Sequence, residues 1–193
     1  MNSLTWGRIV VAHPRAKTLA MRKLWTVAFP TLDDADARFI AGIRARHDRQ
    51  ASMLGPHFTL LFGCDAVDEA VYVDHVRAVA ASTLAFRFEC REAEPDSDDG
   101  RGLVYLVPEQ GRGALTLLHD RLYTGPLAPH WRKDKDFVAH ITMAHAADLA
   151  AAQRLSDELN VDGVAVAGAI DAVVVGSVQN GRFVELARFA LRH

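Results

Sequence analysis

Apolar and polar positions between residues 24 and 95 follow periods that change from strand to helix and back. The run 24–30 is short, β-branched and aromatic, ends at Pro30, and is typical of a strand. Residues 31–47 then space apolar side chains as a helix does, behind Thr31 and acidic residues that suit a helix start. The pattern next predicts a strand at 57–62, a helix at 68–82 and one antiparallel strand at 84–95.

The rest of the chain repeats this order. A strand at 103–108 again ends at a proline and precedes a helix at 113–123. The apolar stripe of this helix is Leu115, Leu118 and Leu122, and that of the helix at 68–82 is Tyr72, Val76 and Val79. The remaining expected elements are a strand at 137–143, a helix at 148–160 with the stripe Leu149, Ala152, Leu155 and Leu159, and strands at 164–178 and 182–191 joined by a turn at Asn180-Gly181. Such self-similarity predicts a duplicated unit with an approximate two-fold axis, its halves joined by an acidic turn at 94–100.

Each half carries the same polar triplet inside an apolar strand. His57 and Thr59 stand two residues apart in the first half, and His140 and Thr142 stand two apart in the second. Alternate side chains of a strand share a face, so each His/Thr pair points away from its apolar neighbours. If the halves are related by a two-fold axis, both pairs are expected to face one cleft.

Two imidazoles and two hydroxyls around one site suit acid/base chemistry. Imidazole titrates near neutral pH, so one histidine can remove a proton while the other delivers one. Threonine hydroxyls can donate hydrogen bonds to the oxygens that gain negative charge in the transition state. The alternative is that each threonine only satisfies backbone groups beside a structural histidine, and the recurrence of both pairs in register favours the functional interpretation.

Composition bounds the class of protein. The 193 residues carry a formal net charge of −2, which argues against non-specific coating of nucleic acid. We expect residues 21–193 to form a single domain and residues 1–20, which lack periodicity, to be an N-terminal extension. No apolar run approaches the roughly 18 residues of a membrane helix. The two cysteines, Cys64 and Cys90, fit no metal spacing, so reduced thiols in a cytoplasmic protein are expected. We also expect no metal, no membrane association and no obligate protein partner.

The two H-x-T triplets, 83 residues apart, resemble those of the 2H phosphoesterase superfamily, and most closely its bacterial 2'-5' RNA ligase-like branch. The likeness covers about residues 24–192. It implies an α+β fold of two pseudo-symmetric lobes, with an antiparallel sheet in each lobe, outer helices and a central cleft. It also implies action without a cofactor on 2',3'-cyclic phosphates of RNA ends or small nucleotides, or on 2'-5' linkages. Two departures are Ala139, where a proline is common, and His145, where a basic residue is common.

The resemblance further implies roles for the triplets. His57 would be the general acid on the leaving oxygen and His140 the general base on water, with the roles exchanged during ligation. Two other functions stay open at this point. One is hydrolysis of another small cyclic phosphate, such as one derived from ADP-ribose, and the other is binding of RNA ends or nucleotides without turnover.

Residues near the second triplet are weaker candidates for substrate binding. In the loop 130–137, the side chains expected to hold flanking phosphates or stack on a base are Trp131, Arg132, Lys133 and Lys135, and the alternative is a solvated charged loop. His145 lies an odd number of residues after His140, so it is expected to reach the cleft only if the strand ends by Ala144. A zinc pair of these two histidines lacks a third ligand.

Overall fold

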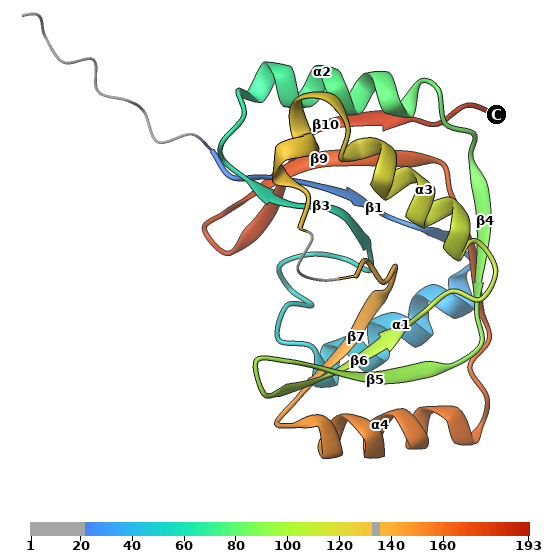
Figure 1. Ribbon diagram of the computed structural model, residues 1–193. Coiled ribbons are helices and arrows are strands. Elements are labelled where there is room, and N and C mark those ends of the chain that lie inside the picture. The colour runs from blue at the N-terminus through green and yellow to red at the C-terminus, as the bar shows by residue number, and fades with distance from the viewer. Residues whose placement is uncertain (1–21, 133–135) are drawn as a thin grey trace, which may run out of the picture.

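The computed structural model describes residues 22–132 and 136–193, which form a mixed α/β fold with antiparallel sheets (Figure 1). The strands are β1 (Leu24–Ala28), β2 (Thr31–Leu32), β3 (Phe58–Cys64), β4 (Phe86–Cys90), β5 (Ala93–Asp98), β6 (Arg101–Leu106), β7 (Ile141–Ala146), β8 (Val166–Ile170), β9 (Ala172–Gln179) and β10 (Arg182–Ala190). The helices are α1 (Asp34–His47), α2 (Glu69–Ala80), α3 (Arg112–Leu122), the 3₁₀ helix η1 (Gly125–His130) and α4 (Leu149–Val161). Among these residues, no helix combines the length and apolarity needed to cross a membrane.

Seven strands form one sheet in the order β10-β9-β1-β3-β7-β6-β5, and β2-β8-β4 form a second. The two strands that follow the triplet histidines, β3 and β7, meet at the pair Phe58 and Ile141. These residues are themselves 83 positions apart, as the two histidines are. A contact between equivalent residues requires an approximate two-fold axis at that point. One sheet therefore runs through both halves, instead of the separate sheet in each lobe that the resemblance implies.

A β-bulge recurs at the same place in each half. Thr59 faces Val27, but the next pair is Leu61 with Thr26, so Leu60 has no partner on β1. In the second half Thr142 faces Tyr105 and the next pair is Ala144 with Val104, so Met143 is the unpaired residue. Both extra residues are fully buried. An extra residue changes which later side chains face the cleft, because strand alternation restarts after it.

The helices cover the sheet in two pairs (Figure 1). Helices α2 and α3 pack on the β10-β9-β1-β3 part, whereas α1 and α4 pack on β7, β6 and β5. The predicted apolar stripes of α2 and α3 are confirmed: the buried side chains are Tyr72, Val76 and Val79 on α2, and Leu115, Leu118 and Leu122 on α3. The predicted turn is also confirmed, since Asn180 and Gly181 both adopt positive φ between β9 and β10.

Several predicted boundaries were wrong. Helix α1 begins after Asp33, whose carboxylate accepts from the backbone N–H groups of Ala35 and Asp36. Thr31 instead belongs to β2, where its hydroxyl donates to Asp171 at 2.8 Å. A carboxylate at the N-cap position thus outcompetes the threonine that sheet pairing holds extended.

Two predicted strands are each divided between the two sheets. The run 84–95 separates into β4 and β5, and the run 164–178 into β8 and β9. The acidic segment 94–100 is mostly the edge strand β5, with a tight turn only at Asp99-Gly100, where φ is 50° and 76°. Acidic side chains are tolerated there because an edge strand is exposed and its charges discourage further pairing.

The stripe predicted for α4 was wrong at its first residue. Leu149 is 49% exposed. The helix instead buries Ala152 and Ser156, and the Ser156 hydroxyl donates to the carbonyl of Ala93 on β5. A small polar residue at this contact lets α4 pack closely on the edge strand and donate a hydrogen bond to its backbone carbonyl.

Candidate active site

The two triplet histidines are held in the same way. The Nδ1–H of His57 donates to the carbonyl of Gly55 at 2.8 Å, and the Nδ1–H of His140 donates to the carbonyl of Val138 at 2.7 Å. A carbonyl can only accept, so these bonds fix the proton on Nδ1 in both rings. Each ring therefore offers Nε2 to a ligand, as an acceptor when neutral and as a donor when protonated.

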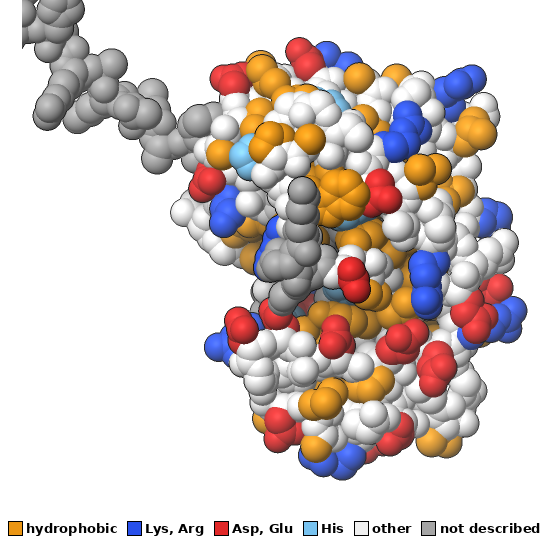
Figure 2. All heavy atoms as spheres, in the orientation of Figure 1, with side chains coloured by type: hydrophobic (Ala, Val, Ile, Leu, Met, Phe, Trp, Pro, Cys, Tyr) orange, Lys and Arg blue, Asp and Glu red, His pale blue; other side chains and the backbone are white. Residues whose placement is uncertain are grey.

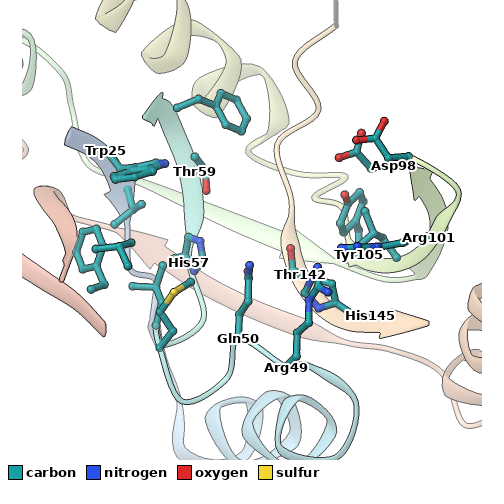
Figure 3. Close-up of a pocket in the computed structure, with 18 residues that line it drawn as sticks. Trp25, Arg49, Gln50, His57, Thr59, Asp98, Arg101, Tyr105, Thr142 and His145 are labelled. Carbon is teal, nitrogen blue, oxygen red and sulfur yellow. The ribbon is translucent and has the colours of Figure 1, made fainter. Parts of the chain in front are cut away.

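Three of the four triplet side chains line one cavity of about 570 Å³: His57, Thr59 and Thr142 (Figure 3). His140 lines an adjoining cavity of about 540 Å³. The two cavities share Phe62, Asp98 and Tyr105. The expected cleft is thus a pair of adjoining hollows, with the second histidine in a different hollow from the other three groups.

Tyr105 lies between the two hollows and contacts His140. The two rings stack with centroids 3.7 Å apart and planes 21° apart. Tyr105, on β6, is also the residue that pairs with Thr142 on the neighbouring strand β7. Burial raises the pKa of its hydroxyl, and the nearby carboxylates of Asp96 and Asp98 act in the same direction, so the phenol stays protonated. The sequence pattern had placed Tyr105 in a strand without indicating this contact.

Burial favours the neutral form of both triplet histidines. It lowers the pKa of His57 to about 4, with smaller decreases from the charges of Arg44 and His140 and opposing effects from the Gly55 bond and Asp48. Burial also lowers the pKa of His140, against the Val138 bond and the charge of Asp96. The charge of His140 is thus one of the influences that disfavour protonation of His57.

His145 lines the same cavity as Thr142, and the reason differs from the one expected. Strand β7 does not end at Ala144 but continues to Ala146. The bulge at Met143 changes the alternation, so a residue three positions after Thr142 returns to the cleft face. The same shift in the first half brings Phe62 to the cleft.

A buried ion pair supports the loop that leads to His57. Arg44 donates from Nε to the Asp48 carboxylate at 2.8 Å and from Nη2 to the carbonyl of Leu54 at 2.8 Å. Both charged side chains are almost fully buried. Because one guanidinium joins both ends of the loop to α1, it fixes the loop residues Arg49 and Gln50, which line the cavity. No periodic pattern marks these two residues, and the sequence prediction did not include them.

A model of the 2'-5' RNA ligase superfamily matches residues 32–182, a span that holds both triplets. The chain belongs to this superfamily. Structural matches are E. coli LigT with 3'-AMP, at TM-score 0.61, 18% identity and coverage of 89% of this chain and 99% of that chain, and TT0787 of Thermus thermophilus, at TM-score 0.59, 19% identity and coverage of 88% and 98%. Kluyveromyces marxianus Usb1 matches at TM-score 0.50, 9% identity and coverage of 86% and 98%. These identities show a shared fold, and no curated protein matches the chain in sequence.

Of the candidate residues in the loop before the second triplet, only some line a cavity. Trp131 packs near Tyr123 and His119, with ring centroids 6.2 and 6.0 Å apart, and lines neither cavity. Arg132 is exposed and lines the second cavity. Lys133 and Lys135 lie outside the described residues, so their contacts with substrate stay a prediction.

On the face of the molecule shown in Figure 2, acidic side chains gather over β5 and α4. Asp96 and Asp98 of β5 line the second cavity. These negative charges beside the cavity disfavour non-specific binding of a polyanion such as a nucleic acid, in agreement with the near-zero net charge of the chain.

Proposed function

We propose that the protein is a phosphodiesterase that opens 2',3'-cyclic phosphates of RNA ends or nucleotides to 2'-phosphates, with ligation to a 2'-5' linkage as the reverse type of reaction. Membership of the 2'-5' RNA ligase superfamily supports phosphoesterase-type chemistry. Structures of E. coli LigT contain 3'-AMP, ATP and NADP+, which is consistent with a nucleotide ligand here. The observation that carries the proposal is the matched pair of Nδ1 bonds, which presents two Nε2 atoms from equivalent positions.

The hydrolysis proceeds by two proton transfers around one phosphorus atom. The base histidine takes a proton from water at Nε2 while the water oxygen forms a bond to phosphorus. The bond from phosphorus to the ribose 3' oxygen breaks, and the acid histidine donates its Nε2 proton to that oxygen. This histidine is protonated on both ring nitrogens when substrate is bound, because the negative charge of the phosphate favours the imidazolium form. The family resemblance assigns the acid to His57 and the base to His140. The side chains of Thr59 and Thr142 donate to the non-bridging oxygens, which carry more negative charge in the transition state.

The wall of the first cavity next to His57 suits a nucleobase. It is largely apolar and comes from β1, the loop after α1 and the β9–β10 hairpin: Trp25, Val27, Met53, Leu54, Val178 and Phe183. The backbone N–H of Phe183 donates to the carbonyl of Met53 at 3.0 Å, which joins the hairpin to the loop. A planar base can therefore lie on this wall while its ribose phosphate reaches the histidines.

The test is to incubate the protein, in the presence of a chelator, with adenosine 2',3'-cyclic phosphate and with an RNA that ends in this group. We expect opening to the 2'-phosphate, detected by chromatography, and its loss in His57→Ala and His140→Ala. The matched control is His47→Ala, because His47 is exposed on α1 and lines neither cavity. A folded wild-type protein that opens neither substrate would contradict the proposal.

A further inference from the structure

The first cavity has two ends of different chemistry. The end beside His57 is apolar, whereas the end beside β7 is lined by Arg49, Arg101 and His145 (Figure 3). Figure 3 shows the side chains of these three residues gathered next to Thr142. Burial lowers the pKa of His145, Asp48 opposes this effect, and the positive charges of Arg49 and Arg101 add smaller decreases, in agreement with their position in the same cavity.

Buried polar groups hold His145 at this end. Its Nδ1 atom lies 2.9 Å from Oδ1 of Asp48, within ion-pair distance but without the alignment of a hydrogen bond. The carboxylate is itself fixed by Arg44 and by the backbone N–H of Gln50. Because Arg44 compensates the charge of Asp48, the carboxylate orients the imidazole without neutralising the two arginines. A contact at Nδ1 leaves Nε2 of His145 to face a ligand.

The nearby acidic groups come from the β5–β6 turn. Asp98 and the exposed Asp99 line the same cavity. In Figure 3 the carboxylate of Asp98 lies on the other side of Tyr105 from Arg49 and His145. Two guanidinium groups with an imidazole suit the oxygens of a phosphate.

In Figure 3, Arg101 and His145 lie on the side of Thr142 that faces away from His57. His145 stands about two strand steps beyond Thr142, a separation of roughly 7 Å. At the equivalent position of the first half, five residues after the histidine, the chain has Phe62 instead. The duplicated frame thus supplies the scissile-phosphate groups twice but this cationic end only once.

We propose that Arg49, Arg101 and His145 form a subsite for a second phosphate, next to the scissile one, and that Asp48 positions His145 in it. The inference rests on the proposed function and names its substrate class. The preferred substrate is a cyclic phosphate on a nucleotide that carries a further phosphate, either the diester of an RNA 3' end or a terminal 5'-phosphate. A nucleoside cyclic phosphate without that group leaves the subsite unfilled.

Calorimetric binding of reaction products tests the subsite without requiring turnover. We expect adenosine 2',5'-bisphosphate to bind about tenfold more tightly than adenosine 2'-monophosphate, since the second phosphate gains charge-assisted hydrogen bonds. The ratio of the two affinities should fall towards one in Arg101→Gln and in His145→Gln, and persist in His145→Arg. Arg154→Gln is the control, because Arg154 is exposed on α4 and lines neither cavity.

A dinucleotide that ends in a 2'-phosphate distinguishes the two sources of the second phosphate. A gain for the dinucleotide assigns the subsite to an RNA diester, and a gain for the bisphosphate alone assigns it to a terminal phosphate. Equal affinities of all three ligands for the wild-type protein, or a ratio that persists in the Arg101 and His145 variants, would overturn the proposal. Opening of adenosine 2',3'-cyclic phosphate without any such ratio would leave the proposed function standing and remove only the subsite.

Discussion

The two halves of the molecule share a backbone frame but differ in the side chains that surround the triplets. Each half places a His/Thr pair before a bulge, with the histidine held by a carbonyl two residues earlier. Opposite the threonine, the first half has Val27 and the second has Tyr105. After the bulge, the first half presents Phe62 and the second presents His145.

This difference separates what the duplication supplies from what each half has acquired. The groups that we propose for proton transfer recur at equivalent positions, so they depend on the shared frame. The neighbouring positions give the cleft an apolar end and a cationic end, and we propose that a ligand with a base and a phosphate binds in one direction only. In this proposal, reaction chemistry and substrate orientation reside in different sets of residues.

The largest expected effects come from removing one histidine at a time. His57→Gln and His140→Gln should each lower kcat by about 10²–10⁴ on a cyclic phosphate, because each loses one proton transfer. A nucleoside 4-nitrophenyl phosphodiester distinguishes the acid from the base, because its leaving group departs without receiving a proton. We expect this substrate to restore turnover in the variant that lacks the acid, His57→Gln, and not in the variant that lacks the base. Release of nitrophenolate is followed by absorbance.

The control for this comparison is His47→Gln, which alters an exposed histidine of α1. If turnover of the nitrophenyl substrate is restored in His140→Gln instead, the two roles are exchanged. If turnover is restored in neither variant, the two halves do not have separate acid and base functions.

Smaller losses are expected from the hydroxyl groups. Thr59→Val and Thr142→Val keep side-chain shape but remove one donor each, and loss of a donor to a transition-state oxygen costs up to about 10² in kcat. Steady-state kinetics on the cyclic nucleotide would measure both. Thr116→Val on α3 is the matched control, since its hydroxyl donates to the carbonyl of Arg112 and the residue lines neither cavity. Unchanged kcat in both cleft variants would mean that the threonines serve only the backbone.

The sequence could predict features that depend on local periodicity. The stripes of α2 and α3, the proline-ended strands and the recurrence of both triplets are all repeated at short or fixed spacing. The division of 164–178 into β8 and β9 was not predictable in this way. The two strands are separated at Asp171, whose carboxylate accepts from Thr31, a residue 140 positions away in the chain.

The site itself shows the same limit. Whether His145 faces the cleft depends on the bulge at Met143, which is a property of how β7 pairs with β6 and not of β7 alone. Arg49 and Gln50 reach the cavity because Arg44 joins Asp48 to Leu54, and such contacts leave no periodic signal. Alternation therefore finds the triplets but not the side chains that surround them.

Replacing Tyr105 with the residue of the other half tests what the asymmetry contributes. Tyr105→Val should lower kcat/KM by about 2–10-fold, because the ring that stacks on His140 is worth roughly 0.5–1.5 kcal/mol in such pairs. Tyr105→Phe keeps the ring and should retain most of the activity. Equal losses in both variants would assign the effect to the hydroxyl, and no loss in either would mean that the stack does not position His140.

The smallest expected effect is on the pH dependence of the free energy of unfolding, which reports how deeply each of the two histidines is buried. A pKa of about 4 for folded His57, against 6.5 for a free imidazole, means that the unfolded chain binds the proton more readily. This contribution to stability is present above pH 6.5 and is lost as the pH falls towards 4. Between pH 7 and 5 the loss is of order 1–2 kcal/mol. The direction is the same for His140, whose pKa is also lowered by burial.

Urea unfolding at pH 7 and pH 5, followed by circular dichroism, measures this difference. His57→Gln and His140→Gln should each lose less stability on acidification than the wild type, because glutamine binds no proton in either state. His47→Gln, on the exposed face of α1, should keep the wild-type dependence. If only one cleft variant shows the smaller loss, the halves differ in how they desolvate their histidines as well as in what surrounds them. If neither does, both imidazoles are solvated in the free protein, and the proton needed by the acid is available without a bound phosphate.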